Sequence, residues 1–254
     1  MNIHIKDEKL FDSIRENSIF EIEIGSSMYQ LKNDNSDTDV LIIYINPISC
    51  RTSFNSHHQL QFKKNGTDYI LTTLEQFVMN ILSGDSTINY EVLCSSQFQN
   101  AFPELSDALS CYNYKVIKSY LGMAKRDLKT IRKKYNNKTA SHFLRGLMFS
   151  EQMILRQNIF ALSTHDFNIL KQVKLGINTL SENDLKFYEE HMNNLRESLI
   201  EQKIDAVRLF EIETAMIKIN ETYVDYLFRD FSTIKYYIRA LELNDFGYEE
   251  KKWK

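Results

Sequence analysis

The first hundred residues alternate between short apolar runs and polar turns, a pattern typical of strands mixed with helices. Residues 19–24 alternate apolar and acidic side chains, which predicts a strand buried on one face. Residues 39–45 are apolar on both faces after the first position, which predicts a central strand. Residues 59–62 and 68–72 flank an Asn-Gly pair, the strongest short hairpin signal, so we expect two antiparallel strands there.

Helical periodicity accompanies these strands and dominates the chain after Pro103. Two short helices are predicted in the first half, over residues 7–16 and 74–82. Longer helices are predicted in the second half over residues 112–135, 139–162, 182–202, 204–228 and 233–243. The pattern therefore predicts an α+β fold, in which a small mixed sheet with flanking helices (residues 1–108) precedes an α-helical bundle (residues 109–254). A cleft is expected between the two domains.

The composition is that of an ordinary soluble globular protein, with 43% hydrophobic and 26% charged residues. The longest apolar run has the length of a strand, so no membrane-spanning segment is predicted. The first residues contain no apolar signal core, which predicts a cytosolic protein. Three cysteines, Cys50, Cys94 and Cys111, form no CxxC pair, which argues against a disulfide framework or a zinc ribbon.

The net charge of −3 conceals an asymmetry along the chain. Residues 1–110 hold seven Lys and Arg against fifteen Asp and Glu, whereas the remainder holds twenty-four against nineteen. An acidic first half attracts metal cations, and a basic second half suits phosphates. Two ordinary solvated surfaces would give the same numbers of charged residues, so the charge asymmetry leaves both interpretations open. Residues 115–138 hold nine Lys and Arg and one acid, Asp127, which fits either a solvated helix face or an RNA- or phosphate-binding face.

Two carboxylates lie one residue apart where the central strand begins. Asp37 and Asp39 point to the same face of an extended chain, and Mg²⁺ or Mn²⁺ prefers such hard oxygen ligands. A third carboxylate would bind a second metal ion, and Asp68, at the start of the strand after the hairpin, is the candidate, with Glu91 in reserve. Asp is also common beside Asn-Gly turns, and a structural or supporting role is the favoured interpretation of Glu91.

The turn before these carboxylates is suited to phosphate. Gly25 ends the first strand and lets a phosphate approach the backbone, while Ser26 and Ser27 offer hydroxyl donors. A polar hairpin loop uses the same residue types. Two aspartates at the start of an apolar strand nevertheless lower the stability of the fold unless they are paired or bound to metal. The nucleotide site is therefore the favoured interpretation.

These residues resemble the DNA polymerase β-like nucleotidyltransferase superfamily. Its pattern of strand, Gly-Ser, a spacer of about ten residues and Asp-x-Asp in an apolar strand is matched by Gly25-Ser26 and Asp37-Thr38-Asp39. The stretch is most similar to a predicted, RNA-repair-associated branch that carries Gly-Ser-x-x-Tyr and Ser-Asp-x-Asp. Tyr29 and Ser36 match that branch, whereas Gln30 stands where the branch has glycine.

The resemblance extends more weakly into the helical half. The segments Tyr120–Lys125 and Lys138-x3-His142-x2-Arg145 are similar to the helical signature of the branch. The resemblance implies that Lys125, Lys138, His142 and Arg145 line the triphosphate side of a cleft. His142 and Arg145 share a helix face by their spacing, and a buried or capping histidine is the alternative.

The implied activity is transfer of a nucleoside monophosphate from a nucleoside triphosphate, ATP favoured, to a hydroxyl, with release of pyrophosphate. Asp37, Asp39 and Asp68 would hold the metal ions, and Asp68 would help to deprotonate the acceptor. An RNA or tRNA end is the favoured acceptor, and a protein hydroxyl receiving AMP is the alternative. The alternative outside enzymes is a non-catalytic module of the same fold that binds a nucleotide or a partner protein.

Overall fold

The computed structural model describes residues 2–4, 8–29, 31, 37–45, 59–110, 113–201 and 203–227, with side chains described within 8–223. Within these ranges, no helix has the length and apolar character needed to cross a membrane. Several residues named above lie outside the described residues: Gln30, Ser36, Cys50, Cys111 and the helix predicted over 233–243.

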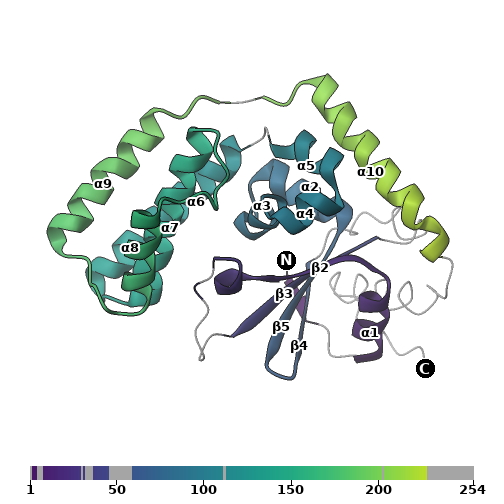
Figure 1. Ribbon diagram of the computed structural model, residues 1–254, viewed down its shortest axis with the longest axis horizontal. Helices are drawn as coiled ribbons and strands as arrows, with labels where there is room; N and C mark the ends of the chain where they lie inside the picture. The colour runs from purple at the N-terminus through teal and green to yellow at the C-terminus, as the bar shows by residue number, and fades with distance from the viewer. Residues whose placement is uncertain are drawn as a thin grey trace, which may run out of the picture. The chain divides into compact units, whose positions relative to one another are not determined.

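Five strands form one mixed sheet in the order β1-β4-β5-β3-β2 (Figure 1). The strands are β1 (Asn2–His4), β2 (Ser18–Ile24), β3 (Thr38–Tyr44), β4 (Gln59–Lys64) and β5 (Thr67–Thr73). The pairs β1–β4 and β3–β5 are parallel, whereas β2–β3 and β4–β5 are antiparallel. The apolar β3 lies inside the sheet between β2 and β5, as its pattern predicted, and the α+β fold class is confirmed.

The β4–β5 hairpin turns at the predicted Asn-Gly pair. Asn65 has φ 52° and Gly66 has φ 78°, so both central residues adopt the left-handed conformation. Two-residue hairpins favour this conformation because its twist matches that of the strands, and Asn and Gly reach it at the least cost. The hairpin then fixes the register that places Lys63 opposite Asp68.

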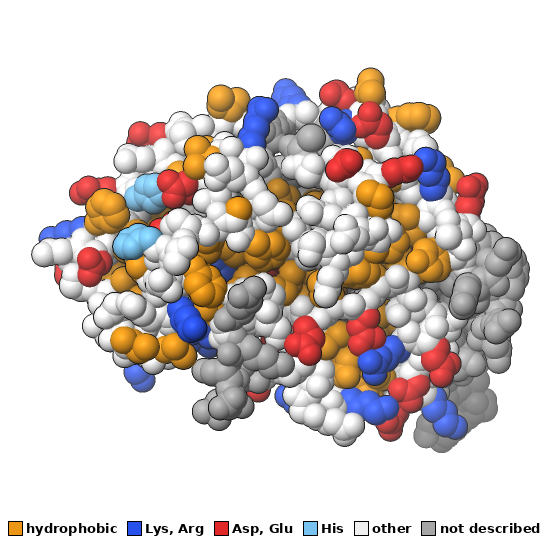
Figure 2. All heavy atoms as spheres, in the orientation of Figure 1, with side chains coloured by type: hydrophobic (Ala, Val, Ile, Leu, Met, Phe, Trp, Pro, Cys, Tyr) orange, Lys and Arg blue, Asp and Glu red, His pale blue; other side chains and the backbone are white. Residues whose placement is uncertain are grey.

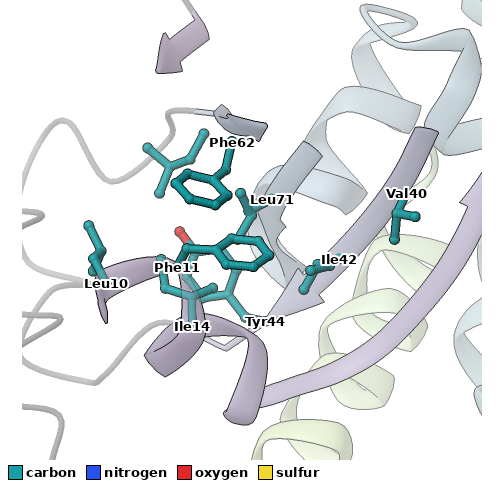
Figure 3. Packing of buried hydrophobic residues seen from close by; sticks show 9 residues of the cluster. Leu10, Phe11, Ile14, Val40, Ile42, Tyr44, Phe62 and Leu71 are labelled. Carbon is teal, nitrogen blue, oxygen red and sulfur yellow. The ribbon is translucent and has the colours of Figure 1, made fainter. Parts of the chain in front are cut away.

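Helix α1 (Glu8–Glu16) covers the core on one face of the sheet (Figure 3). Its buried side chains, Leu10, Phe11 and Ile14, lie three or four residues apart and so share one helix face. The Phe11 ring stacks on Phe62 of β4 with ring centroids 4.3 Å apart.

The remaining helices are mostly longer and follow β5. They are α2 (Leu74–Ser83), α3 (Thr87–Leu93), α4 (Ser96–Ala101), α5 (Pro103–Ser110), α6 (Tyr114–Lys133), α7 (Asn137–Ile154), α8 (Thr164–Lys174), α9 (Glu182–Glu197) and α10 (Ala206–Leu227). Helices α6 and α7 pack closely on each other, with Gly146 of α7 near the backbone of Tyr120 of α6. A β-carbon at Gly146 would lie 3.4 Å from the Tyr120 carbonyl oxygen, so glycine permits this close approach.

The helix predicted over residues 139–162 is wrong beyond its first two thirds. Helix α7 ends at Ile154, and Arg156 has φ 55°, a left-handed conformation that stops the helix. A separate helix, α8, then begins after an N-cap at Ser163, whose hydroxyl accepts from the Asp166 backbone N–H. The helix predicted over 182–202 is correct in its start but ends at Glu197.

By its internal contacts, the chain groups into two compact units. The first, the sheet unit, comprises Met1–Gly25, Asn35–Val78 and Glu213–Lys254; the second, the helical unit, comprises Ser26–Asp34 and Met79–Ile212. The segment that begins at Ser26 therefore belongs with the helices, although Gly25 belongs with the sheet. The division into a nucleotidyltransferase domain over residues 1–108 and a helical domain over residues 109–254 stays a prediction.

Candidate nucleotide and metal site

Two of the three predicted metal ligands stand side by side on neighbouring strands. Asp39 of β3 and Asp68 of β5 are register partners in the parallel pair, and both are half-buried. Paired residues on adjacent strands point to the same face of a sheet, so both carboxylates belong to one face. Asp37 lies one residue before β3 begins at Thr38 and is exposed, so the strand itself carries only Asp39 of the predicted pair.

Gly25 meets Asp39 at the end of β2. Ile24, the last residue of β2, pairs with Asp39, and Gly25 follows directly with φ +69°. A β-carbon added at Gly25 would lie 3.3 Å from the Asp39 Oδ2 atom, closer than most such contacts. The positive φ favours glycine here, and a β-carbon would press on the Asp39 carboxylate.

The Asp68 carboxylate is already paired. Lys63, its register partner on β4, places its Nζ atom 3.1 Å from the Asp68 Oδ1 atom, and both side chains are substantially exposed. Metal binding by Asp68 would exchange this ammonium for a metal ion. Within the described residues, no group of three or more His, Cys, Asp or Glu side chains lies close enough to hold a metal ion.

The turn after Gly25 is tied to the helical unit. Gly25–Ser27 form a short 3₁₀ turn, and the Leu31 N–H donates to the Ser26 carbonyl oxygen at 3.0 Å. The Lys174 ammonium of α8 donates to the Leu31 carbonyl oxygen at 2.8 Å. These bonds fix the backbone that follows the two serines.

Tyr29 anchors the same segment in the helical core. Its side chain is buried, and its ring lies near Phe149 and Phe160, with centroids 5.7 Å and 6.1 Å away. The Arg145 guanidinium carbon lies 4.4 Å from the Tyr29 ring centroid, within cation–π distance. The Tyr29 hydroxyl donates to Glu91. The motif tyrosine is therefore a packing and hydrogen-bonding anchor.

Glu91 accepts from two tyrosines at a fully buried position. The Tyr120 hydroxyl donates to Glu91 Oε1 at 2.6 Å, and an Arg145 nitrogen lies 4.0 Å from the same oxygen. Burial raises the pKa of Tyr29 and of Tyr120 well above the ordinary value, so both hydroxyls remain donors at neutral pH. Both Glu91 oxygens are thus occupied, which favours the structural role over metal ligation.

Arg145 has one donor left over. Its side chain is only 16% exposed, and within the described residues its Nε atom is buried without a hydrogen-bond partner. A buried unpaired donor is costly, and an anionic oxygen would satisfy it. Burial opposes the charge on Arg145, but the neighbouring Tyr29 and Glu91 hold its pKa above the ordinary value.

Further cations surround this arginine. Burial first, and then the positive charges of Arg145, Lys138, Lys174 and Arg126, lower the pKa of His142 to about 4. Burial also lowers the pKa of Lys174, with contributions from Arg145 and Lys138. The predicted Lys138, His142 and Arg145 are therefore brought together on α7. The charges of Lys138, Arg145 and Lys174 create a positive potential suited to phosphate, beside a His142 that is neutral at neutral pH.

The remaining predicted contact, Lys125, is exposed on α6. Sequence reasoning missed Lys174, because α8 was not predicted as a separate helix. It also placed no role on Glu91 and Tyr120 as partners of the motif tyrosine. The only available signal was the co-occurrence of these residues in the segments similar to the nucleotidyltransferase branch.

A Gly-Ser turn leaving one strand beside an Asp-bearing neighbour in a small mixed sheet is the architecture of the polymerase β-like nucleotidyltransferases. A family model described as "RlaP: RNA repair pathway DNA polymerase beta family" matches residues 3–208. The chain therefore belongs to this family. A comparison with curated proteins found no match.

Proposed function

We propose that this protein transfers a nucleoside monophosphate from a nucleoside triphosphate to an acceptor hydroxyl, with release of pyrophosphate. The observation that carries the proposal is the register of Asp39 with Asp68, with Gly25 held against Asp39. Family membership over residues 3–208 supports the same reaction class. Phosphoryl chemistry of this kind needs positioning and charge neutralisation more than covalent catalysis by the protein.

Asp37, Asp39 and Asp68 are the proposed ligands of Mg²⁺ or Mn²⁺. Carboxylate oxygens are the hard donors that these ions prefer, so the donor set fits, provided that Asp68 gives up its pairing with Lys63. The metal ions would neutralise phosphate charge and lower the pKa of the acceptor hydroxyl. Asp68 is also proposed to accept the proton of the acceptor hydroxyl.

Ser26 and Ser27, with the Gly25 backbone, are proposed to bind the β- and γ-phosphates. Lys138, His142 and Arg145, which belong to the same compact unit as the two serines, are the proposed basic contacts, and Lys125 is a further candidate. The unpartnered Arg145 Nε atom supports an anion at this group. ATP is the favoured donor.

An RNA end is the favoured acceptor, in keeping with the RNA repair pathway named in the family description. The second candidate is a non-catalytic nucleotide-binding module. The Lys63–Asp68 pair favours it, because a carboxylate committed to lysine leaves only two acids for metal.

Thermal unfolding with each nucleoside triphosphate, with and without magnesium, tests the site. Ligand at a hundred times its Kd adds about 2.7 kcal/mol, which is about 5–10 °C in a chain of this size. We expect the shift to need magnesium, to be largest with ATP and to vanish in Asp39→Ala. Asp107→Ala, an exposed carboxylate on α5, is the matched control.

Transfer of α-labelled nucleotide to RNA then separates the two candidates. Asp37→Ala and Asp39→Ala should each lower the rate by about a hundredfold or more, the scale for losing a charge partner in the transition state. A magnesium-dependent shift without any transfer to RNA or protein would favour the binding module. No shift with any triphosphate would refute the nucleotide site.

A further inference from the structure

Helix α6 has two sharply different faces. Its buried side chains, Val116, Ile117, Tyr120, Leu121, Ala124, Asp127, Leu128 and Ile131, all lie on one side. Six exposed cations occupy the opposite side, within an arc of about 100° at 3.6 residues per turn. These residues define the α6 basic stripe: Lys115, Lys118, Lys125, Arg126, Lys129 and Lys133. No acidic residue lies in the arc.

Most of the stripe lacks charge compensation. Lys115, Lys125, Lys129 and Lys133 have no acidic partner within the described residues. Arg126 approaches only the adjacent Asp127, at 3.5 Å. Like charges three or four residues apart on a helix repel one another, so the stripe destabilises its own helix.

Other surfaces of the same protein balance their charges. Just outside the stripe, Arg132 pairs with Glu182 at 3.2 Å and with Glu189 at 2.9 Å. Helices α9 and α10 intersperse both signs along their lengths, and Figure 2 shows acidic and basic side chains intermingled on the face in view. The single sign on α6 is therefore a local property of this helix.

Gly122 lies inside the stripe, so no side chain projects from the helix at that position. It is exposed, and a β-carbon added there would meet no atom within 4 Å. Glycine in a helix interior is less stable than alanine, and here no packing constraint requires it. Its absent side chain leaves the helix backbone open to close approach between flanking lysines, so two independent features of α6 lower stability without serving the fold.

We propose that the α6 basic stripe is the docking surface for the phosphate backbone of an RNA strand, the acceptor of the transferred nucleotide. From Lys115 to Lys133 the stripe extends about 27 Å at 1.5 Å per residue, long enough to follow several nucleotides. Lysines contact phosphates as point charges without reading sequence, which suits the end of any RNA. This inference rests on the proposed function, because it names where that reaction's acceptor binds. It assigns Lys125 to the RNA backbone and leaves the triphosphate to Lys138, His142 and Arg145.

The test is RNA binding by charge-neutral variants of the intact protein. The triple variant Lys118→Gln, Lys129→Gln, Lys133→Gln is compared with Lys171→Gln, Lys186→Gln, Lys203→Gln, which removes the same charge from exposed positions elsewhere on the helical unit. The probe is a fluorescent single-stranded RNA of about twenty nucleotides, followed by anisotropy over a range of salt concentrations. Each phosphate contact to a single strand contributes about 0.7 to the slope of log K against log salt.

We expect the stripe variant to lower that slope by about 2 and to weaken binding at least tenfold at low salt, while the control variant binds as the wild type does. Equal loss in the two variants would overturn the proposal, because net charge alone would explain it. Competition by polyglutamate as strong as by unlabelled RNA would also overturn it, in favour of an acidic protein partner.

The magnesium-dependent thermal shift with ATP separates this inference from the proposed function. If the stripe variant loses RNA binding but keeps the ATP shift, both stand, and its folding is confirmed. If RNA binding depends on the stripe but no triphosphate shifts the melting temperature, the docking surface stands and the nucleotidyl transfer fails. If ATP shifts the melting temperature and the stripe variant binds RNA as the wild type does, only the inference fails.

Discussion

At the scale of single residues, the motif tyrosine is explained by burial. The Tyr29 hydroxyl donates one of the hydrogen bonds that stabilise the buried Glu91 carboxylate. Tyr120 donates a second hydrogen bond, and the Arg145 guanidinium lies 4.0 Å away. An unpaired buried charge would cost several kcal/mol, so the four side chains depend on one another. Their network fixes the segment that follows the Gly-Ser turn.

We expect Tyr29→Phe to lower the free energy of unfolding by about 1–3 kcal/mol, because Glu91 loses a donor that nothing replaces. Urea unfolding measures the loss. Tyr188→Phe is the matched control, since within the described residues the half-buried Tyr188 hydroxyl makes no hydrogen bond. A loss no larger than that of the control would mean that the Tyr29 hydroxyl does not support Glu91.

Alanine substitutions at Gly25 and Gly66 distinguish backbone strain from crowding of the Asp39 carboxylate. Both glycines have positive φ, +69° and +78°, but only a β-carbon at Gly25 would approach Asp39, whereas Gly66 has open space. Gly25→Ala and Gly66→Ala should each destabilise the protein by about 1 kcal/mol. Only Gly25→Ala should also remove the magnesium-dependent ATP shift, and loss of that shift in both variants would contradict a specific role for Gly25.

His142 makes stability depend on pH. Its pKa is lowered from 6.5 to about 4 in the folded protein, so the unfolded chain binds more protons between these values. The contribution to stability is complete above pH 6.5 and is lost as the pH falls through 4. Melting temperatures should fall less steeply between pH 7.5 and pH 4 in His142→Gln than in the wild type. Equal slopes would show that His142 does not carry this pH dependence.

At the scale of elements, prediction succeeded where the periodicity was strong and local. Strands β2 and β3 and the β4–β5 hairpin follow from alternation, an apolar run and an Asn-Gly pair. Helices α3, α4 and α5 were not predicted, because elements of six to eight residues carry little periodicity and depend on packing. Serine side chains cap α3 and α4, at Ser86 and Ser95. The break after α7 was missed because Arg156 adopts its positive φ without a Gly or Pro signal.

Helix α6 offers an element-scale prediction. We expect Gly122→Ala to raise the free energy of unfolding by about 0.5–1 kcal/mol, since glycine lowers helix stability and the added methyl group meets no atom. Gly146→Ala should gain less, because its methyl group would press on the Tyr120 carbonyl. Denaturant unfolding measures both, and equal gains would show that α6 and α7 pack more loosely than the structure indicates.

At the scale of the whole molecule, the predicted site residues belong to two different units. The carboxylates Asp37, Asp39 and Asp68 belong to the sheet unit, whereas the serines after Gly25 and the basic group on α7 belong to the helical unit. The acids and the Gly-Ser turn were predicted from motif spacing, and the basic group was predicted from the resemblance to the nucleotidyltransferase branch. The sequence could not predict that the chain changes unit between Gly25 and Ser26, because that change depends on the burial of Tyr29 among helices distant in sequence.

The proposed roles of Lys138 in phosphate binding and of Asp39 in metal binding should be separable by mutation. Lys138 is exposed, so Lys138→Gln removes a proposed phosphate contact without opening the core. Loss of one charge-assisted hydrogen bond should raise the KM for ATP about tenfold or more, with kcat little changed. Asp39→Asn should instead lower kcat, because its charge acts on the reacting phosphate.

AMP provides the matched ligand, since it lacks the β- and γ-phosphates. Lys138→Gln should leave the Kd of AMP unchanged while weakening ATP, and titration calorimetry with both nucleotides measures the difference. Equal weakening of AMP and ATP would place Lys138 near the nucleoside or the α-phosphate, and the basic group on α7 would then not bind the end of the triphosphate that leaves as pyrophosphate.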